Sequence, residues 1–497
     1  MKLPTHVSLL STSALLCLIM MACTSDSPTV PLRAIPDFNA AFSHRLADNK
    51  LTVCHMSDED PPHNIEIAAA AREAHAAHGD HISEFVVDKA SAQIGDGVHF
   101  GRIGDAIVAA REVRVARDEQ ETAACRITIV VAAGVYRGSV SQSTDPTFER
   151  YPLVIDVPDV TLHGALDMEI DASGRATGVG LNDGVTTLVA SPSLVSVLNF
   201  SEPLLAVNGH PDGFKGNGVI VEGLAFQSGH AGVDALIGGL GVLSLRVRDL
   251  VVSGNRFEAG FSESVDLRAS SGRVDRNHFS GGGGTCDMCL AGPGDYGAEG
   301  NRLLAGGIPG ILVVPATGLI VPPGRGIEVY VLPTSANVNA TLVNNEVRDH
   351  LRQPVGVGIR VGAVGVGAPN VAGTAHVGAY DNVLVNNRFA MMVEAAFPMP
   401  NTLRKGDIEL TLHGNVLSES CQNNFLVSFS RHRTALGLNT DPYLLNSSYT
   451  LSLGGNIAWD DVWYSHPAGF GNTLTVDGVV IPNGSRVAYD GARTCTP

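Results

Sequence analysis

The stretch DLVVSGNRFEAGFSESVDLRASSGRVDRNHFSGGGGTCDMCLAGPGDYGAEGNRL, residues 249–303, contains one short phrase three times. In each copy a glycine or arginine is followed by asparagine, by any residue and by a large apolar residue. The three asparagines, Asn255, Asn277 and Asn301, are 22 and 24 residues apart. A repeat of this length is typical of stacked structural units, each of which buries its apolar face against the next.

Related phrases occur on both sides of this stretch. Residues 219–226 align with the repeats, with Leu224 at the asparagine position, and later copies lie at 343–347, 385–389, 413–417 and 455–457. A turn between parallel strands needs a residue that tolerates left-handed backbone angles, and a stacked asparagine can hydrogen-bond its equivalent one coil away. We therefore interpret the asparagines as a structural ladder rather than as ligand-binding residues.

The composition favours short strands separated by turns. The 497 residues include 56 glycines, few aromatic residues (5%) and enough hydrophobic residues (44%) for a large core. A solenoid can reach this length as one body because it grows by adding coils. The net charge of −17 repels nucleic acid and anionic membrane surfaces, so we expect no nucleic-acid partner.

Apolar and amphipathic segments surround the repeats. An amphipathic helix is predicted over 99–110, because Ile103 and Ile107 lie on one face. Strands are predicted at 127–137, 152–155, 160–164, 310–314 and 326–331. An Asp-Gly pair at 477–478, between two apolar runs, predicts a β-hairpin over 473–481 that covers the last coil.

The helix followed by ITIVVAAGVY and VTLHG resembles the opening of right-handed parallel β-helix proteins, the superfamily that includes pectate lyases and pectin methylesterases. The resemblance covers roughly residues 98–470. It implies an all-β, right-handed parallel β-helix solenoid of roughly ten or more coils, with an N-terminal capping helix and a C-terminal hairpin cap. It is specific for the fold and unspecific for the activity.

The N-terminus has the pattern of an export signal. Residues 1–22 contain a lysine and then an apolar run too short for a stable membrane span. The sequence Met20-Met21-Ala22-Cys23 resembles a bacterial lipobox, which implies a lipid on Cys23, contact with the membrane only through that lipid, and delivery to the outer membrane. An ordinary signal peptide is the alternative. We expect a tether at 23–50, a small module at 51–85, the β-helix at 86–470 and a cap at 471–497.

Six further cysteines would remain after export: Cys54, Cys125, Cys286, Cys289, Cys421 and Cys495. An even number in an exported chain suggests disulfides, although six cysteines allow 15 connectivities. Pairing of nearest neighbours would give 54–125, 286–289 and 421–495. A redox role for the 286–289 pair is the alternative to a local staple.

The module at 51–85 resembles a small Cys-His…His-x-x-His-Gly-Asp unit of secreted bacterial proteins. It keeps the opening Cys54-His55 and the closing His75, His78, Gly79 and Asp80, and its alanine-rich part, 65–77, is predicted to be helical. Thiolate and neutral imidazole are ligands that zinc and copper prefer. The candidate metal ligands are Cys54, His55, His75, His78 and His81. The alternative is that these histidines are half-exposed helix and turn residues and that Cys54 is oxidised to Cys125.

A candidate catalytic groove follows from strand alternation. In Val265-Asp266-Leu267-Arg268 we expect Asp266 and Arg268 to point outward, and Arg273 and Asp275 to lie on the next coil. Polysaccharide lyases of the resembled superfamily use Asp or Glu to hold calcium and Arg or Lys as a base, and hydrolases use paired carboxylates. These four residues could take either set of roles, or could form cross-coil ion pairs. No complete active-site motif of the superfamily accompanies them.

A second candidate site contains both tryptophans of the chain. Trp459, Asp461 and Trp463 combine aromatic faces with a carboxylate, which suits stacking on sugar rings. Packing of the terminal cap on the last coil would explain the same residues.

Two functions fit these patterns. The first is a surface or periplasmic β-helix lipoprotein that binds or processes polysaccharide; as an enzyme it would be a polysaccharide lyase or a glycoside hydrolase. The second is a non-catalytic structural or adhesive protein of the cell surface. The expected cofactor, where there is one, is a divalent cation: calcium in the groove or zinc in the module. The sequence makes no prediction of oligomeric state.

Overall fold

The computed structural model describes residues 50–482 with interruptions at 58–59, 91–95, 117–123, 139–147, 173, 175, 180–183, 191–202, 209–216, 228–239, 259–260, 262, 281–311, 315–318, 322–324, 332–336, 351–356, 365–373, 397–405, 421–422, 430–445, 455–461, 466–468 and 470. Every described residue belongs to one compact unit, 38–497. The expected signal peptide, the lipid site Cys23 and the two remaining cysteine pairs lie outside the described residues, as does most of the tether.

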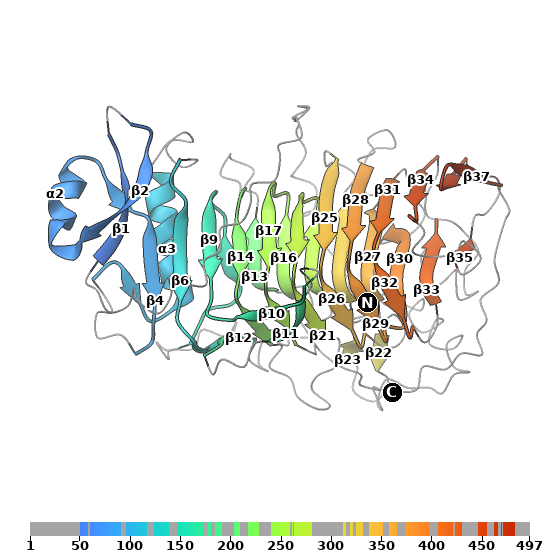
Figure 1. Cartoon of the computed structure of the whole chain (residues 1–497), viewed down its shortest axis with the longest axis horizontal. Coiled ribbons are helices and arrows are strands. Elements are labelled where there is room, and N and C mark those ends of the chain that lie inside the picture. Colours follow the sequence, from blue (N-terminus) through green and yellow to red (C-terminus); the bar gives the residue numbers. More distant parts are fainter. Residues whose placement is uncertain are drawn as a thin grey trace, which may run out of the picture. The chain divides into compact units, whose positions relative to one another are not determined.

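Three long sheets form the body of this unit (Figure 1). The thirteen-stranded sheet contains β4 (Glu84–Val87), β5 (His99–Phe100), β6 (Ile127–Val131), β9 (Val160–His163), β14 (Ile220–Glu222), β17 (Leu250–Ser253), β20 (Gly272–Asp275), β25 (Val338–Val343), β28 (Thr374–Tyr380), β31 (Asp407–His413), β34 (Ser448–Ser452), β36 (Thr473–Val476) and β37 (Val479–Ile481).

The eight-stranded sheet contains β7 (Gly134–Gly138), β12 (Thr186–Ala190), β15 (Ala225–Gln227), β18 (Arg256–Phe257), β21 (His278–Ser280), β26 (Glu346–Arg348), β29 (Val383–Val385) and β32 (Val416–Ser418). The nine-stranded sheet contains β8 (Leu153–Ile155), β13 (Pro203–Asn208), β16 (Leu240–Leu245), β19 (Glu263–Arg268), β24 (Arg325–Val331), β27 (Val357–Val364), β30 (Phe389–Ala396), β33 (Asn423–Ser428) and β35 (Val462–Ser465).

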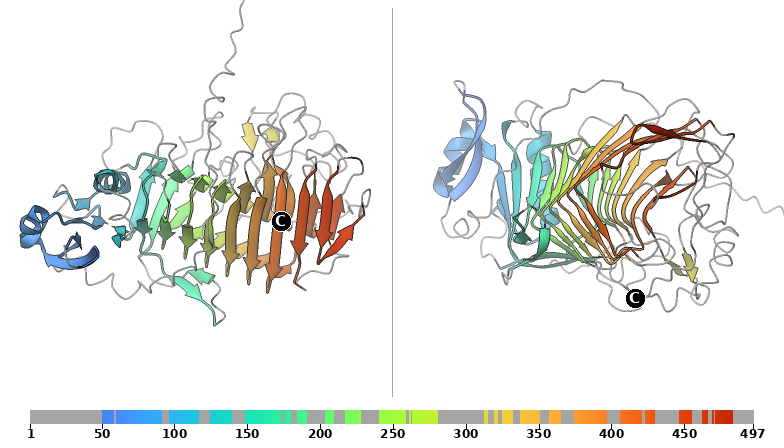
Figure 2. Two further views of the ribbon diagram at one scale, coloured as in Figure 1. Left: turned by 90° about the horizontal axis from the view of Figure 1, so that it is seen from above. Right: turned by 45° about the vertical axis from the view of Figure 1, so that its right-hand side comes forward.

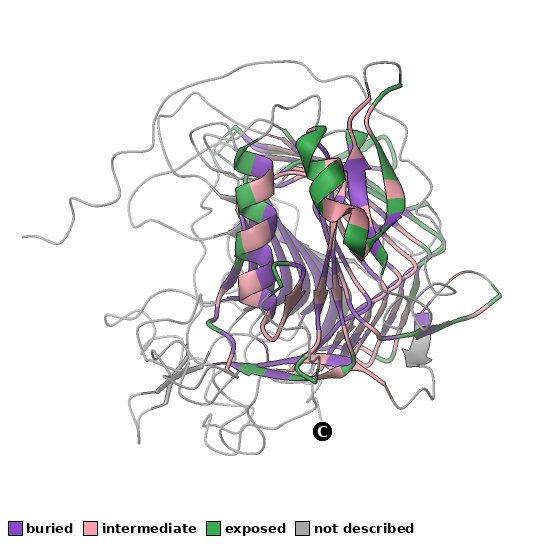
Figure 3. Ribbon diagram, turned by 90° about the vertical axis from the view of Figure 1, so that its left-hand side faces the viewer, coloured by how far each residue is buried: buried purple, intermediate pink, exposed green. Residues whose placement is uncertain are grey.

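The chain visits the three sheets in a fixed order and returns to the first. After β17, β18 and β19, for example, β20 pairs in parallel with β17. This succession is the right-handed parallel β-helix that the sequence predicted, and Figure 2 shows the stacked coils from two further directions. Buried residues line the inside of the coil (Figure 3). They include a stack of three phenylalanines, Phe226, Phe257 and Phe279, whose ring centroids are 4.7 and 4.8 Å apart.

The turns between the thirteen-stranded and eight-stranded sheets hold the predicted ladder. Each ladder asparagine donates from Nδ2 to a backbone carbonyl of the preceding coil. Its Oδ1 accepts the backbone N–H of the equivalent residue in that preceding coil. The members are Asn255, Asn277, Asn345, Asn382 and Asn415. Leu224 occupies the first position, where its N–H donates to Asn255 Oδ1 at 3.0 Å. The alignment of Leu224 with the asparagines was therefore correct.

The left-handed backbone angle belongs to a different residue than we predicted. It is the residue before each ladder asparagine that has positive φ: Gly254, Arg276, Asn344, Asp381 and Gly414, with φ between 52° and 67°. One turn position supplies the backbone angle, and the next supplies the buried hydrogen bonds. The assignment of the phrase at 385–389 to this ladder was also wrong, because Asn387 lies in the following turn, where it hydrogen-bonds His350 and Val347.

The helix α3 (Ile103–Val115) lies at the N-terminal end of the coil and packs on β4, β6 and β8. It begins and ends later than the predicted 99–110, because His99 and Phe100 form β5. Ile103 and Ile107 are buried, as predicted. Arg114 is fully buried and donates to the carbonyls of Cys125 (2.7 Å) and Asp159 (2.8 Å), which fixes the helix to the first coil.

Glu149 holds the first turn of α3. Its carboxylate is 1% exposed and accepts the N–H groups of Ile103 (2.8 Å) and Gly104 (3.1 Å). These donors have no partner within the helix, because the first N–H groups of any α-helix lack one. The contact explains how a residue far along the chain positions the capping helix.

Replacing Glu149 with alanine is expected to lower the free energy of unfolding by about 2 kcal/mol, because two buried N–H groups lose their acceptor.

Burial raises the pKa of Glu149 from its ordinary 4.5, and the two N–H bonds offset this only partly. When folding raises the pKa of a carboxyl, that carboxyl stabilises the folded state fully at pH values below its unfolded-state pKa. This stabilisation is lost as pH rises through the folded-state pKa. Glu149→Gln, which cannot ionise, should therefore lose less stability than the native chain as pH rises above about 4.5. Urea unfolding at a series of pH values measures this, and equal pH slopes would contradict it.

The C-terminal hairpin was predicted correctly. The strands β36 and β37 pair in antiparallel fashion, and β36 continues the thirteen-stranded sheet through its pairing with β34. The strand expected at 310–314 has a different place than we predicted, because β22 (Leu312–Val314) pairs with β23 (Leu319–Val321) in a separate antiparallel sheet. A second such hairpin joins β10 (Met168–Ile170) to β11 (Ala176–Val179).

The small module precedes β4. It contains β1 (Lys50–His55), β2 (His63–Ala68), the 3-10 turn η1 (Ala69–Ala71), α2 (Arg72–Ala77) and β3 (His81–Ile82), with β1 between β2 and β3 in one antiparallel sheet. The predicted helix over 65–77 is therefore wrong in its first part, where Ile65 to Ala68 pair with β1 instead. Cys54 and Cys125 form a disulfide that joins the module to the first coil.

Within the portion that the structure describes, no helix has the length and apolar character needed to cross a membrane.

Candidate functional site

The four predicted groove residues lie on two sheets. Asp266 and Arg268 belong to β19 of the nine-stranded sheet, whereas Arg273 and Asp275 belong to β20 of the thirteen-stranded sheet. β20 follows β19 and pairs with β17, so the second pair begins the next coil, as predicted. It lies on a different sheet, however, and therefore not beside the first pair in one groove. The outward direction of Asp266 was correct, because its neighbours Val265 and Leu267 are part of the core.

Each predicted pair forms its own ion pair. Arg268 Nε lies 2.6 Å from Asp266 Oδ2, and Arg273 lies 3.0 Å from Asp275 Oδ2. Arg276 adds a second contact to Asp275 at 3.2 Å. The sequence analysis had expected any ion pairs to run between coils. Instead, each pair joins two residues of one strand.

The structure places two charged residues that the sequence analysis does not predict in line with Asp266. Asp266 of β19 is in register with Glu328 of β24, and Glu328 is in register with Arg360 of β27. Adjacent strands lie about 4.8 Å apart, so three successive coils carry charged residues in one line. Arg360 Nη1 pairs with Glu328 Oε1. We call Asp266, Arg268, Glu328 and Arg360 the charged row.

The charged row is shielded from water although it lies on the outer face of the sheet. Asp266 and Glu328 are 0% exposed and Arg360 is 1% exposed, and only Arg268 is partly open. Burial of charges costs free energy even when they are paired, so such pairs are weak devices for stability. Two carboxylates and two guanidinium groups at one place are therefore a candidate site. The carboxylates can accept hydrogen bonds or a cation, and the guanidinium groups can donate hydrogen bonds.

The same register line leads to the second predicted site. Beyond Arg360 it continues through Met392 and Leu426 to Trp463 of β35. Five strand spacings separate Asp266 from Trp463, which is roughly 24 Å along the axis of the coil. One residue from each of the two predicted sites, Asp266 and Trp463, thus lies on the same line. Trp459 and Asp461 lie outside the described residues.

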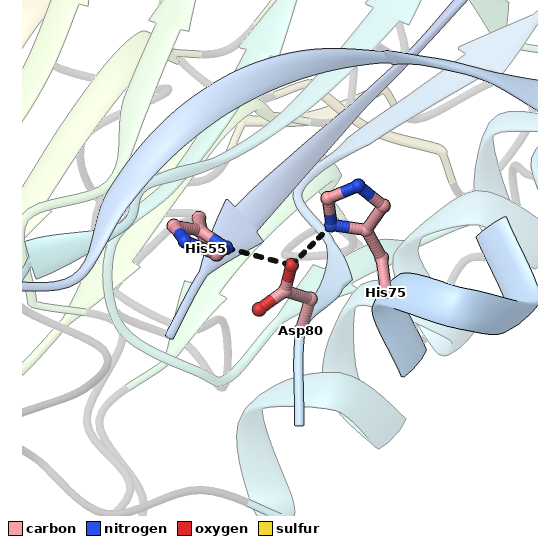
Figure 4. A group of neighbouring side chains, drawn as sticks. All are labelled: His55, His75 and Asp80. Carbon is pink, nitrogen blue, oxygen red and sulfur yellow. Dashed lines mark hydrogen bonds and ion pairs between the residues drawn. The ribbon is translucent and has the colours of Figure 1, made fainter. Parts of the chain in front are cut away.

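Two histidines of the module, His55 and His75, face one carboxylate (Figure 4). Nδ1 of His55 lies 2.9 Å, and Nδ1 of His75 lies 2.6 Å, from the same oxygen of Asp80, Oδ2. Asp80 Oδ1 accepts the N–H of Met56 at 2.8 Å. Potential ligand atoms of His55, His75 and Asp80 lie within 4.8 Å of one another. We call these three residues the His-Asp cluster.

The other predicted metal ligands do not join this cluster. Cys54 is in the disulfide and cannot offer a thiolate, so its prediction as a ligand was wrong. His78 is exposed at the end of α2, and His81 is buried in β3, outside the group of three. Asp80, which we quoted in the motif but did not name as a ligand, takes their place.

The electrostatics of Asp80 reflect its hydrogen bonds. Burial raises the pKa of this carboxyl, but hydrogen bonds from His55, Met56 and His75 outweigh burial and lower the pKa to about 2. The carboxylate is thus ionised at neutral pH and faces two imidazole rings.

Signals for the missed residues are visible in the sequence. Glu328 and Arg360 follow the pattern Gly-Ile-x-Val in GIEV and GIRV, which repeats Ser-Val-Asp-Leu of β19 with the polar residue between two inward ones. Asp266, Glu328 and Arg360 are separated by unequal lengths of sequence, so their alignment cannot be found from a fixed period.

Comparisons with known proteins find no matching family model and no matching curated sequence. Among solved structures, endo-xylogalacturonan hydrolase from Aspergillus tubingensis shares 10% identity over 82% of this chain and 94% of its own, with a TM-score of 0.34. Pectin methylesterase from carrot shares 11% identity over 82% and 86%, with a TM-score of 0.29. A hyperthermoactive exopolygalacturonase from Thermotoga maritima shares 11% identity over 81% and 92%, with a TM-score of 0.28. Similarity at these values supports no conclusion about substrate or reaction.

Proposed function

We propose that the protein binds a polysaccharide along the outer face of the nine-stranded sheet, with the charged row as the centre of the site. The observation that carries this proposal is the single register line from Asp266 through Glu328 and Arg360 to Trp463. A solenoid offers a repetitive, extended surface, which suits a ligand that is itself a repeating polymer. Carboxylate and guanidinium groups hydrogen-bond sugar hydroxyls, and indole faces stack on sugar rings.

Charge limits which glycans suit this site. The charged row has two acidic and two basic residues and is therefore neutral, while the whole chain carries −17. A neutral polysaccharide meets no long-range repulsion, whereas a polyuronate would need a divalent cation such as calcium to offset the charge. The proposal includes export as a lipoprotein through Cys23, which the pattern of residues 1–22 supports.

The buried carboxylates of the charged row must become accessible before a ligand can contact them. Asp266 and Glu328 are shielded from water in the structure, so a ligand must displace the groups that cover them. We expect binding to be slower than for an open groove, because this displacement precedes contact.

The proposal predicts a selective loss of binding when the charged row is neutralised. Purified protein is incubated with plant, algal and bacterial polysaccharides, with and without calcium, and binding is measured by calorimetry. Glu328→Gln and Asp266→Asn should each weaken binding of the best ligand at least tenfold, because each removes a charged hydrogen-bond acceptor. New reducing ends and unsaturated products, measured in parallel, show whether the glycan is also cleaved.

Asp275→Asn is the matched control for this experiment. Asp275 is buried like Asp266, pairs with two arginines and lies on the strand that follows β19, but this strand belongs to the thirteen-stranded sheet. Its substitution should leave binding unchanged. Equal losses in Asp275→Asn and Asp266→Asn would move the site elsewhere, and absence of binding to every glycan would favour a structural or adhesive role.

A further inference from the structure

The His-Asp cluster of the small module has the composition of a metal site. β1 ends at His55, α2 carries His75 in its last turn, and Asp80 follows three residues after the helix ends. Between His75 and Asp80 the backbone folds back on itself. The N–H groups of His78 and Asp80 both donate to the carbonyl of His75, and Gly79 adopts a φ of 93°. This turn points the Asp80 carboxylate toward Nδ1 of His75, between the two histidines (Figure 4).

We propose that His55, His75 and Asp80 bind one divalent cation of the zinc class. Two imidazole nitrogens and one carboxylate oxygen are ligands that zinc accepts, at about 2.0–2.2 Å each. The present separations of 2.9 and 2.6 Å between the nitrogens and Asp80 Oδ2 are hydrogen-bond distances. Small rotations of the two rings would therefore suffice to admit an ion between them. Calcium and magnesium suit the site poorly, because they prefer oxygen ligands.

Accessibility supports an exchangeable ion. The side chains of His55 and His75 are 34% and 27% exposed, whereas that of Asp80 is 0% exposed. Two ligands are thus reachable from solvent while the third is held inside, where the N–H of Met56 orients it.

Three protein ligands leave a coordination position open, as in catalytic rather than structural zinc sites. His75 and Asp80 also line a cavity of about 420 Å³, to which Arg72, His81 and Glu112 contribute. The cavity offers space for a water molecule or a small ligand beside two of the three metal ligands. The His-Asp cluster is separate from the charged row, and metal binding there does not depend on the proposed polysaccharide.

The disulfide contributes to the site without ligating the ion. Cys54 is fully buried and bonded to Cys125, and it immediately precedes His55. It fixes the end of β1 against the first coil. The cysteine that the sequence analysis assigned to the metal is thus a positioning residue.

Metal binding is tested on the purified chain without a histidine tag, after chelator treatment and dialysis. Calorimetric titration with zinc should give one ion per chain, and calcium should not compete. His55→Ala and His75→Ala should each weaken zinc binding at least tenfold, because each removes one of only three ligands. Cobalt, which replaces zinc and absorbs visible light when bound by nitrogen and oxygen ligands, should give a spectrum that His75→Ala abolishes.

His78→Ala is the matched control, since His78 lies at the same end of α2 but is exposed and outside the cluster. It should bind zinc and cobalt like the native chain. If His75→Ala disturbs the module, shown by a lower urea midpoint without metal, His75→Gln replaces it, because glutamine can still donate to Asp80 but has no imidazole. Failure of the native chain to bind zinc, or an equal loss in His78→Ala, would overturn the proposal.

Discussion

The double substitution Cys54→Ser and Cys125→Ser should lower the free energy of unfolding by about 4 kcal/mol. The disulfide closes a loop between residues 71 apart in sequence, and closure of a loop of this length removes about 4 kcal/mol of chain entropy from the unfolded state. Both cysteines are fully buried, so the substitution also exchanges buried sulfur for buried hydroxyl groups. Urea unfolding followed by circular dichroism measures the change.

The loss should concentrate in the module. Its core residues are few: Leu51, Val53, Ile67 and Ile82. Without the covalent link the module depends on them and on the contact between β1 and β4. Hydrogen exchange should therefore accelerate in β1 and β2 more than in the coils of the β-helix.

A reducing agent provides the control, because the chain has other cysteines. Reduction should destabilise the native chain by about 4 kcal/mol more than the double variant, because any other cysteine pair is reduced in both chains. An equal effect of reduction on the two chains would mean that the pair Cys54–Cys125 does not supply this stability.

The fold was predictable because its determinants are local and repeated. Alternation of inward and outward residues, as in Val265 to Arg268, depends only on the strand geometry, and the structure has the predicted directions. The Asp-Gly pair fixed the C-terminal hairpin for the same reason, since a two-residue turn connects neighbours in sequence.

Errors arose where two turns have similar sequences. Asn382 in the ladder and Asn387 in the next turn are both buried asparagines that hydrogen-bond across coils. Asn382-Val383-Leu384 and Asn387-Arg388-Phe389 match the repeat equally well, and closure of the coil decides which turn is which. Closure depends on all three sheets and is not encoded in a phrase of four residues.

The candidate sites depend still more on such long-range geometry. Glu328 and Arg360 are 32 residues apart, and His55 and Asp80 are 25 residues apart. Residue types suggested the chemistry in both places, but only stacking and turn geometry select the partners. Cys54 illustrates the limit, because a thiol beside a histidine suggests a ligand until its disulfide partner is known.

Asn277→Ala is expected to lower the free energy of unfolding by about 3–5 kcal/mol, because several buried groups lose partners worth 1–3 kcal/mol each. Asn277 Oδ1 accepts both the backbone N–H of Asn255 (2.9 Å) and its Nδ2 (3.1 Å), and Nδ2 of Asn277 donates to the carbonyl of Val252 at 2.8 Å. Alanine removes these hydrogen bonds and leaves a cavity, because the side chain of Asn277 is fully buried. Urea unfolding of the variant measures the loss.

The matched control is Asn64→Ala, since Asn64 is an exposed asparagine whose side chain makes one long hydrogen bond, at 3.4 Å, to Arg126. It should change the free energy of unfolding by less than about 0.5 kcal/mol. The comparison separates two meanings of the repeated asparagine. If the ladder exists only to make turns, Asn277→Ala should cost little, because Arg276 already supplies the left-handed backbone angle. If the ladder is a buried hydrogen-bond chain, the loss at Asn277 should exceed that at Asn64 several-fold, and the stacking of coils would depend on the asparagines more than on the turn conformation.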